Sequence, residues 1–217
     1  MTNLRHRLAT DTRYTLLGLP NAIAHFSVTV AGVAAGLGSA VAFVGLPILS
    51  GTAIVARSLS DFERVALPDV LGRSVARPDY SPVPERAGWF RRMMNPLASG
   101  QAWIDLLYGI VAFPISLAAA VVTAVWWAGT IAGLTFPLYG WILTRIPGFD
   151  GGLPQLLGLG DGELTYVGFN TVIGVLFALT LLPIVRGAAL IKASLAQALL
   201  TRAAYTPAER PVLLTTA

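Results

Sequence analysis

Three long stretches of this chain contain no Asp, Glu, Lys or Arg. They cover residues 14–56, 106–144 and 164–185, which are 43, 39 and 22 residues long. A helix needs about 20 apolar residues to cross the hydrocarbon core of a bilayer. The third stretch is therefore predicted to form one membrane span. The first stretch is too long for a single span and is predicted to fold back near residues 36–39.

The composition also indicates a membrane protein. Hydrophobic residues make up 55% of the chain and charged residues 12%, and the mean hydropathy is +0.68. Soluble domains contain about 25% charged residues, so the composition excludes a disordered chain and an ordinary soluble enzyme. The chain has no Cys and two His, which excludes a disulfide framework and a thiolate metal site. We expect no cofactor and no metal.

The basic residues indicate orientation in a membrane. They are fourteen Arg and one Lys, Lys192, and they give a net charge of +4 without gathering on one soluble face, so we expect no nucleic-acid partner. Loops rich in Lys and Arg stay in the cytoplasm. The N-terminus, residues 57–105 and the C-terminal part are Arg-rich, whereas residues 145–163 carry one Arg against three acids. We expect a multi-pass protein of the cell membrane with both termini cytoplasmic.

Charge counting also predicts the number of spans. The segment before residues 106–144 is Arg-rich and expected inside, whereas the loop after them is acidic and expected outside, so this stretch is expected to cross once. Three alternatives stay open for residues 128–144, which continue the helix, lie at the interface or re-enter the membrane. The four spans are expected near residues 15–35, 40–56, 103–125 and 164–185.

An offset of 90 residues aligns the two halves of the chain. It pairs Ala22 with Ala112 and Pro47 with Pro137, and residues 54–57 then fall near residues 183–186. Each copy is predicted to contain two membrane helices followed by a cytoplasmic amphipathic helix. Because each copy would cross the membrane twice, the copies are expected to be parallel repeats. The predicted fold class is an all-α membrane protein with four transmembrane helices in two parallel repeats.

The predicted organisation follows from these spans. Its parts are a cytoplasmic N-terminus (1–13), a first transmembrane hairpin (14–57), a cytoplasmic amphipathic arm and linker (58–102), a second transmembrane repeat (103–186) with an external loop at about 137–163, a cytoplasmic amphipathic helix (187–201) and a flexible tail (202–217).

Several motifs resemble those of a known family. Residues 13–20 (RYTLLGLP) look like its opening, and residues 44–47 (VGLP) with 56–64 (ARSLSDFER) are similar to its first-repeat signature. Residues 95–96 (NP) with 103–108 (WIDLLY) resemble its entry to the second repeat. The family is the putative sensor domain of actinobacterial membrane proteins, often found N-terminal to histidine kinase modules. The resemblance covers roughly residues 13–200.

The resemblance implies the membrane input of a signalling protein, with no catalytic residues. Residues 201–217 contain no phosphoacceptor His in a helical segment and no Gly-rich nucleotide-binding domain. Any signalling output is therefore expected from another chain. The expected partners are a histidine kinase or a membrane transporter acting in trans.

Several residues within the predicted spans are candidates for a switch or for helix packing. His25 is the only titratable side chain of its stretch, and ionisable residues inside a membrane are functional candidates; the alternative is a neutral packing residue. Gly32 with Gly36, and Gly129 with Gly133, fit the small-xxx-small pattern of closely packed helices. These glycines are expected either to pack helices within the chain or to form an interface with a second copy or a partner.

Two prolines are candidate hinges. Pro47 and Pro137 each lie in a predicted apolar helix, and a proline inside a helix removes a hydrogen bond and produces a kink. The alternative is that they only shape the bundle.

The cytoplasmic arm and linker contain candidate contact residues. Aromatic side chains mixed with Arg fit a segment that lies on an anionic membrane surface, and the alternative is docking of a partner. The candidate contact residues are Phe62, Arg64, Trp89, Phe90, Arg91 and Arg92.

The sequence offers no constellation of residues for catalysis. It has no paired carboxylates within the predicted spans, no nucleophile with a base and no Gly-Lys phosphate loop. We therefore expect a non-enzymatic sensor-type or accessory protein that acts on a signalling or transport partner through helix packing. The alternative is a small transport or channel subunit. The expected partners are the lipid bilayer, a separate membrane protein or a second copy of the chain.

Overall fold

The described part of the chain is built from helices. The computed structural model describes residues 4–39, 44–76, 78, 88, 94–146, 152–160 and 162–201, and none of these residues forms a strand. The predicted all-helical fold is confirmed. The helices are α1 (Leu4–Gly38), α2 (Gly45–Leu71), the short 3-10 helix η2 (Asn95–Ala98), α4 (Gly100–Leu143), α5 (Gly152–Leu156) and α6 (Glu163–Leu200).

Local sequence signals set two of the helix ends. Helix α2 ends at Gly72, which has a φ of 69° and whose N–H donates to the carbonyl of Pro68. Glycine adopts this left-handed conformation without a steric penalty, so it closes a helix readily. Helix α4 begins after Ser99, whose Oγ accepts a hydrogen bond from the N–H of Ala102 at 3.2 Å. A serine in this place satisfies one of the free N–H groups of the first turn.

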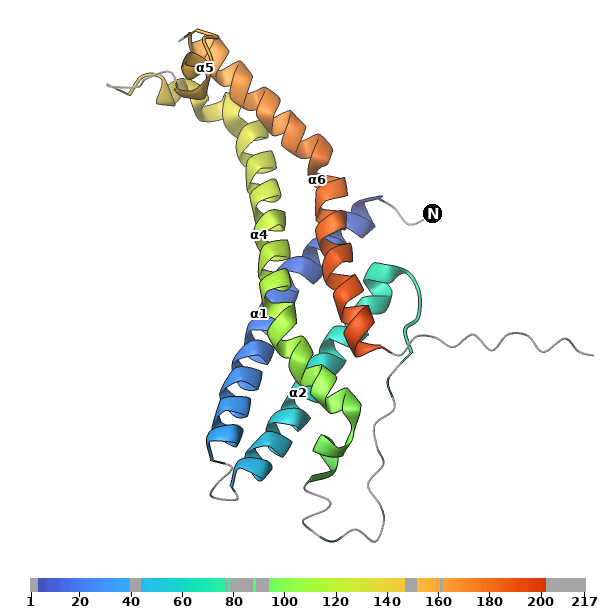
Figure 1. Cartoon of the computed structure of the whole chain (residues 1–217). Coiled ribbons are helices and arrows are strands. Elements are labelled where there is room, and N and C mark those ends of the chain that lie inside the picture. Colours follow the sequence, from blue (N-terminus) through green and yellow to red (C-terminus); the bar gives the residue numbers. More distant parts are fainter. Residues whose placement is uncertain are drawn as a thin grey trace, which may run out of the picture.

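The long helices form two antiparallel hairpins that cross each other (Figure 1). Helices α1 and α2 make the first hairpin, and α4 and α6 make the second, with α5 at its far end. The far ends of the two hairpins point in opposite directions (Figure 1). All four long helices pack together only in the middle of the molecule, where the hairpins overlap.

Helices α1 and α4 run in opposite directions, whereas parallel repeats would require them to run in the same direction. The rings of Phe26 in α1 and Phe113 in α4 stack with their centroids 4.7 Å apart. Trp127, further along α4, donates from Nε1 to the Oγ1 of Thr12, which comes earlier in α1, at 3.1 Å. Helices α1 and α4 are therefore antiparallel, and the two hairpins have opposite directions. The prediction of parallel repeats assumed that each copy crosses the membrane twice, and the observed helix directions do not follow from that assumption.

Helices α1 and α6 run in the same direction. Asp11 of α1 pairs with Arg186 of α6, and Tyr14 contacts Lys192 further along α6. The placement of both termini in the cytoplasm stays a prediction.

Among the described residues, three helices are long and apolar enough to cross a membrane. They are α1, α4 and α6, whereas α2, which carries several charged residues, is not among them. These three helices support the predicted membrane protein.

Helix α4 is continuous to Leu143, so residues 128–143 continue the helix and the loop expected from about 137 starts later. The amphipathic segments expected at residues 58–71 and 187–200 are not separate elements. They continue α2 and α6 without a break.

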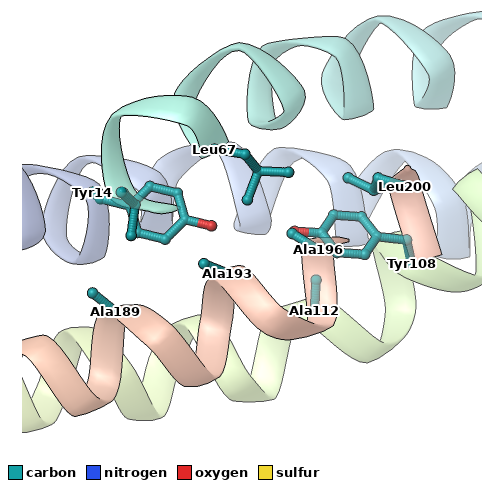
Figure 2. Close-up of a cluster of buried hydrophobic side chains, with 9 residues drawn as sticks. Tyr14, Leu67, Tyr108, Ala112, Ala189, Ala193, Ala196 and Leu200 are labelled. Atoms are coloured by element: carbon teal, nitrogen blue, oxygen red, sulfur yellow. The ribbon is translucent and has the colours of Figure 1, made fainter. Parts of the chain in front are cut away.

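Small side chains allow the helices to approach closely at the centre. The buried hydrophobic cluster includes Tyr14 and Leu67, and α6 contributes Ala189, Ala193 and Ala196, all of which are 0% exposed. Figure 2 shows these three alanines on the face of α6 that is turned towards Tyr14 and Leu67. Because alanine is short, the backbone of α6 lies close to α1 and α2, and polar side chains can reach across.

The antiparallel packing of α1 and α4 can be tested by cross-linking. A Cβ atom placed on Gly109 would lie 2.5 Å from the Oγ1 of Thr29, and disulfides join Cβ atoms about 3.5–4.5 Å apart. We expect Thr29→Cys with Gly109→Cys to form a disulfide upon mild oxidation of the native membrane. The chain has no native Cys, so the band shift on a non-reducing gel reports only this pair.

The control pair is Gly36→Cys with Leu49→Cys, which joins α1 to α2 within one hairpin. It should form in any arrangement that keeps this hairpin. If the control forms and the 29/109 pair does not, the antiparallel packing is wrong.

Candidate functional site: a buried ionic cluster

The centre of the bundle contains charged side chains that are shielded from solvent. Each of the four long helices contributes at least one of them, and five of the six are at most 3% exposed. The ionic cluster consists of Asp11 of α1, Glu63 and Arg64 of α2, Asp105 of α4, and Arg186 and Lys192 of α6.

Arg64 makes the largest number of these contacts. Its Nη2 lies 2.6 Å from Oδ1 of Asp105, and its Nη1 lies 2.7 Å from Oδ1 of Asp61. Its Nε donates to the carbonyl of Leu200 at 2.8 Å. Gln101 donates to the same Asp105 oxygen at 3.1 Å. Arg64 therefore joins α2, α4 and α6. Its guanidinium group is planar and has several donors in fixed directions, so it can bond to several helices at once.

Lys192 occupies a closed polar site between α1 and α2. Its Nζ lies 3.2 Å from Oε1 of Glu63, donates to the carbonyl of Tyr14 at 3.2 Å and sits 4.0 Å from the centroid of the Tyr14 ring. The hydroxyl of Tyr14 donates to the same Glu63 oxygen at 2.6 Å. A Cβ atom on Gly18 would clash with Nζ, so this glycine makes room for the ammonium group.

Arg186 forms the third ion pair. Its Nη1 lies 2.8 Å from Oδ1 of Asp11 and also donates to the carbonyl of Val70 at 2.9 Å. The Arg186 side chain is 29% exposed, whereas that of Asp11 is 2% exposed. This pair therefore lies at the edge of the cluster, while the other two lie inside it.

The three main ion pairs all connect the first hairpin to the second. Asp11 pairs with Arg186, Glu63 with Lys192 and Arg64 with Asp105. A buried ion pair adds little net stability because desolvation offsets the attraction, but the loss of one partner leaves a buried charge and is costly. The cluster therefore fixes how the hairpins fit together.

In the second half of α2, two charged residues lie inward and two apolar residues lie outward, although Leu67 and Val70 are buried and Asp69 is exposed. Glu63 and Arg64 are each 3% exposed, whereas Phe62 is 63% and Val65 is 64% exposed. A helix in water shows the opposite pattern. Charged residues of membrane helices face the bundle interior and pair there, so this arrangement is typical of a helix in contact with lipid.

The last turn of α6 is held by side chains from α2 and α4. Besides the bond from Arg64 to Leu200, Gln101 donates to the carbonyl of Leu199 at 3.1 Å, and Arg73 donates to Oε1 of Gln197 at 2.9 Å. The last carbonyls of a helix have no partner within the helix. Here the carbonyls of Leu199 and Leu200 accept from Gln101 of α4 and Arg64 of α2, so the end of α6 depends on the position of α2 and α4.

His25 lies on the α1 face that packs against α4. It is 1% exposed, and its ring centroid lies 5.7 Å from that of Tyr108. A Cβ atom on Gly109 would lie 2.6 Å from its Cδ2. The structure places His25 next to the ionic cluster and not within it, and its role as a switch stays a prediction.

The glycine motifs lie at contacts within the chain. Added Cβ atoms on Gly32 and Gly36 would clash with Thr52 and Leu49 of α2. Gly129 faces Phe177, and Gly133 lies against the backbone of Gly174 in α6. These contacts explain both motifs by packing of the hairpins, with no need for a second copy.

The two prolines occupy different places. Pro47 lies in the first turn of α2, where a helix has no hydrogen bond to lose, so it starts the helix and does not kink its interior. Pro137 lies inside α4. A hinge role at either position stays a prediction.

The predicted contact residues separate into three groups. Phe62 is exposed, as a contact residue should be. Arg64 was expected on a surface but is buried, because it is paired with Asp105 across the hairpins. Trp89, Phe90, Arg91 and Arg92 lie outside the described residues.

Sequence reasoning did not identify most of the ionic cluster. Asp105 and Arg186 stand at the ends of charge-free stretches, and Lys192 is the only Lys of the chain. These features were signals that the sequence offered. The pairing partners of these residues are far away in the sequence, so no local pattern connects them. In the part of the chain that the structure describes, no group of three His, Cys, Asp or Glu side chains lies close enough to hold a metal ion.

Comparison with known proteins gives one match. The model of the family described as Putative sensor matches residues 14–200, which is most of the chain. No curated protein and no solved structure matches. The matched range includes every long helix except the start of α1, and all of the ionic cluster except Asp11. The chain therefore belongs to the Putative sensor family.

Proposed function

We propose that this chain is a non-enzymatic integral membrane protein that acts on a separate signalling or transport partner through helix packing. The observation that carries the proposal is the ionic cluster, which joins all four long helices and, through Arg64, the last turn of α6. A shift of either hairpin changes the ion pairs, and it also changes the hydrogen bond from Arg64 to the end of α6. The family match supports the sensor-type role.

The inward charges of α2 support a location of this helix in the bilayer together with α1, α4 and α6. Hydropathy alone omits α2 because this helix carries five charged residues, of which only Glu63 and Arg64 are buried. With these charges paired inside the bundle, the outward residues Ile54, Phe62 and Val65 are left to contact lipid. We therefore propose a multi-pass protein of the cell membrane with four embedded helices.

The burial pattern supports an internal repeat with opposite directions. Shifting α2 by 129 residues superimposes its buried positions on those of α6. Ser60 corresponds to Ala189, and Leu67 to Ala196, and all four are 0% exposed. Glu63 corresponds to Lys192, and these two residues pair with each other. We propose two related hairpins that meet at this ion pair.

The proposed role is tested by purifying the tagged chain from native membranes in mild detergent, followed by mass spectrometry. We expect a histidine kinase or a transporter to be recovered in a fixed ratio with the chain. Arg64→Lys keeps the charge but loses the forked contacts, and we expect it to reduce this recovery. The matched control is Arg13→Lys, because Arg13 is exposed on α1.

Two results would reject the proposed role. Recovery of the chain alone, as a defined oligomer, would favour an autonomous pore or carrier. Equal recovery of the partner with Arg64→Lys and Arg13→Lys would show that the ionic cluster has no role in partner binding. Size-exclusion profiles of both variants establish that they remain folded.

A further inference from the structure

Several buried polar side chains in the bundle have no hydrogen-bond partner in the part of the chain that the structure describes. Each is at least nine-tenths buried. Exposed threonines behave differently, since Thr135 and Thr180 donate to carbonyls of their own helix at 2.7 Å. The unpartnered groups are Oδ2 of Asp11, both ring nitrogens of His25, and the hydroxyls of Thr29, Ser60, Ser116, Thr123 and Thr130.

Three of these hydroxyls lie on one face of α4. Ser116, Thr123 and Thr130 are spaced by seven residues, which is close to two helical turns, so they follow one another about 10 Å apart along the axis. Gly109 precedes Ser116 by the same interval and contacts both His25 and Thr29 of α1. The polar groups of α1 therefore continue the row of α4 hydroxyls at its N-terminal end.

The other end of the row lies beside Asp11. Trp127 stands between Thr123 and Thr130 in α4 and donates to the hydroxyl of Thr12. Asp11 is the neighbour of Thr12, and its Oδ1 is taken by Arg186 while its Oδ2 has no partner. The row thus runs from an imidazole to a carboxylate, with hydroxyl groups between them.

A dry interior is unfavourable for such a row. Each buried polar group without a partner costs about 1–3 kcal/mol, and native proteins satisfy such groups with internal water. Hydroxyls about 10 Å apart along α4 cannot bond to one another directly. Water molecules placed between them can accept from one group and donate to the next.

We propose that the α1–α4 contact binds a row of ordered water molecules that connects His25 with Asp11 through Ser116, Thr123 and Thr130, with Thr29 beside His25 at the end of the row. Such a row transfers protons between the two titratable groups. In each transfer one O–H or N–H bond breaks as the next forms, so no oxidant or reductant is needed. The charged and titratable side chains around His25 are Glu63 and Arg64 of α2 and Tyr108 of α4, and the His25 ring also faces the backbone of Asp105. Arg7 and Arg186 lie near Asp11. The proposal does not depend on the sensor role.

Water-edited solid-state NMR of the full chain in lipid bilayers tests this site. Labelled Thr and His report on the row, and labelled Val and Ala report on the dry core. The chain has only two His, His6 and His25. If water is bound, magnetisation from water should reach His25, Thr29 and Thr123 at least about fivefold faster than it reaches the dry core residues Val185 and Ala193. Equal slow transfer to both sets would overturn the proposal.

An isosteric variant localises the effect. Thr123→Val removes one hydroxyl and keeps the shape of the side chain, and we expect it to slow the transfer to Thr130 and His25 at least about twofold. The matched control is Thr135→Val, since Thr135 is on the same helix but exposed and bonded to the carbonyl of Ile131. If both variants leave the transfer unchanged, the water does not form a row along α4 and the proposal fails.

Discussion

Replacing Arg64 by glutamine is expected to lower the free energy of unfolding by about 3–5 kcal/mol. Asp105 is 0% exposed, and its carboxylate would lose the Arg64 group that lies 2.6 Å away. The carbonyl of Leu200 would lose its donor at the same time. The penalty arises mainly from the charge left without its ion-pair partner inside the bundle.

Reversible unfolding in detergent micelles measures this effect, with a matched control at Arg73. Arg73 also bonds to α6, through Gln197, but at an exposed site. Arg73→Gln should therefore cost less than about 1 kcal/mol. The double variant Arg64→Gln with Asp105→Asn should recover much of the loss, because neither side chain then carries a charge. A loss at Arg64 no larger than that at Arg73 would mean that the ion pair does not hold the hairpins together.

Replacing Gly133 by alanine is expected to destabilise the second hairpin by about 3 kcal/mol. A Cβ atom at this position would clash with the backbone of Gly174. Backbone atoms cannot move aside as the end of a flexible side chain can, so α4 and α6 would have to separate. The separation would also disturb the contacts between Trp126 and Phe177, whose ring centroids are 5.3 Å apart.

Gly168→Ala provides the control for this substitution. Gly168 lies in α6, but an added Cβ atom would meet nothing within 4 Å. Alanine favours a helix over glycine by about 0.5–1 kcal/mol, so this variant should be neutral or slightly more stable. Thermal unfolding of both variants in the same detergent gives the comparison. Equal stability of the two would show that the close contact at Gly133 has no energetic role.

The sequence predicts the helices of this protein better than their arrangement. The hydrocarbon core of a bilayer disfavours charged side chains, which explains the long charge-free stretches. These stretches lie largely in α1, α4 and α6. The glycine motif at Gly129 and Gly133 also predicts a close contact, because only small residues let backbones approach. Direction is not encoded in this way, since an apolar helix surface packs against a neighbour in either orientation.

The ionic cluster is hard to predict for a related reason. Arg64 and Asp105 are separated by 41 residues, and Arg186 and Asp11 by 175. Arg64 lies in a segment whose Arg, Asp and Glu residues are typical of a solvated arm, and only the packing of α2 turns it inward. Amphipathic analysis assumes that charged residues face water, and this assumption fails for Glu63 and Arg64.

The ion pairs between the hairpins also have a consequence for the biogenesis of the protein. The cluster residues of the first hairpin carry a net charge of −1 and those of the second carry +1, because every main pair joins one hairpin to the other. During synthesis the first hairpin is complete before Arg186 and Lys192 have been translated, so Asp11 and Glu63 must wait for their counter-charges. A chain that ends before Arg186 would leave Asp11 and Glu63 without these partners, and a buried charge without its partner is costly.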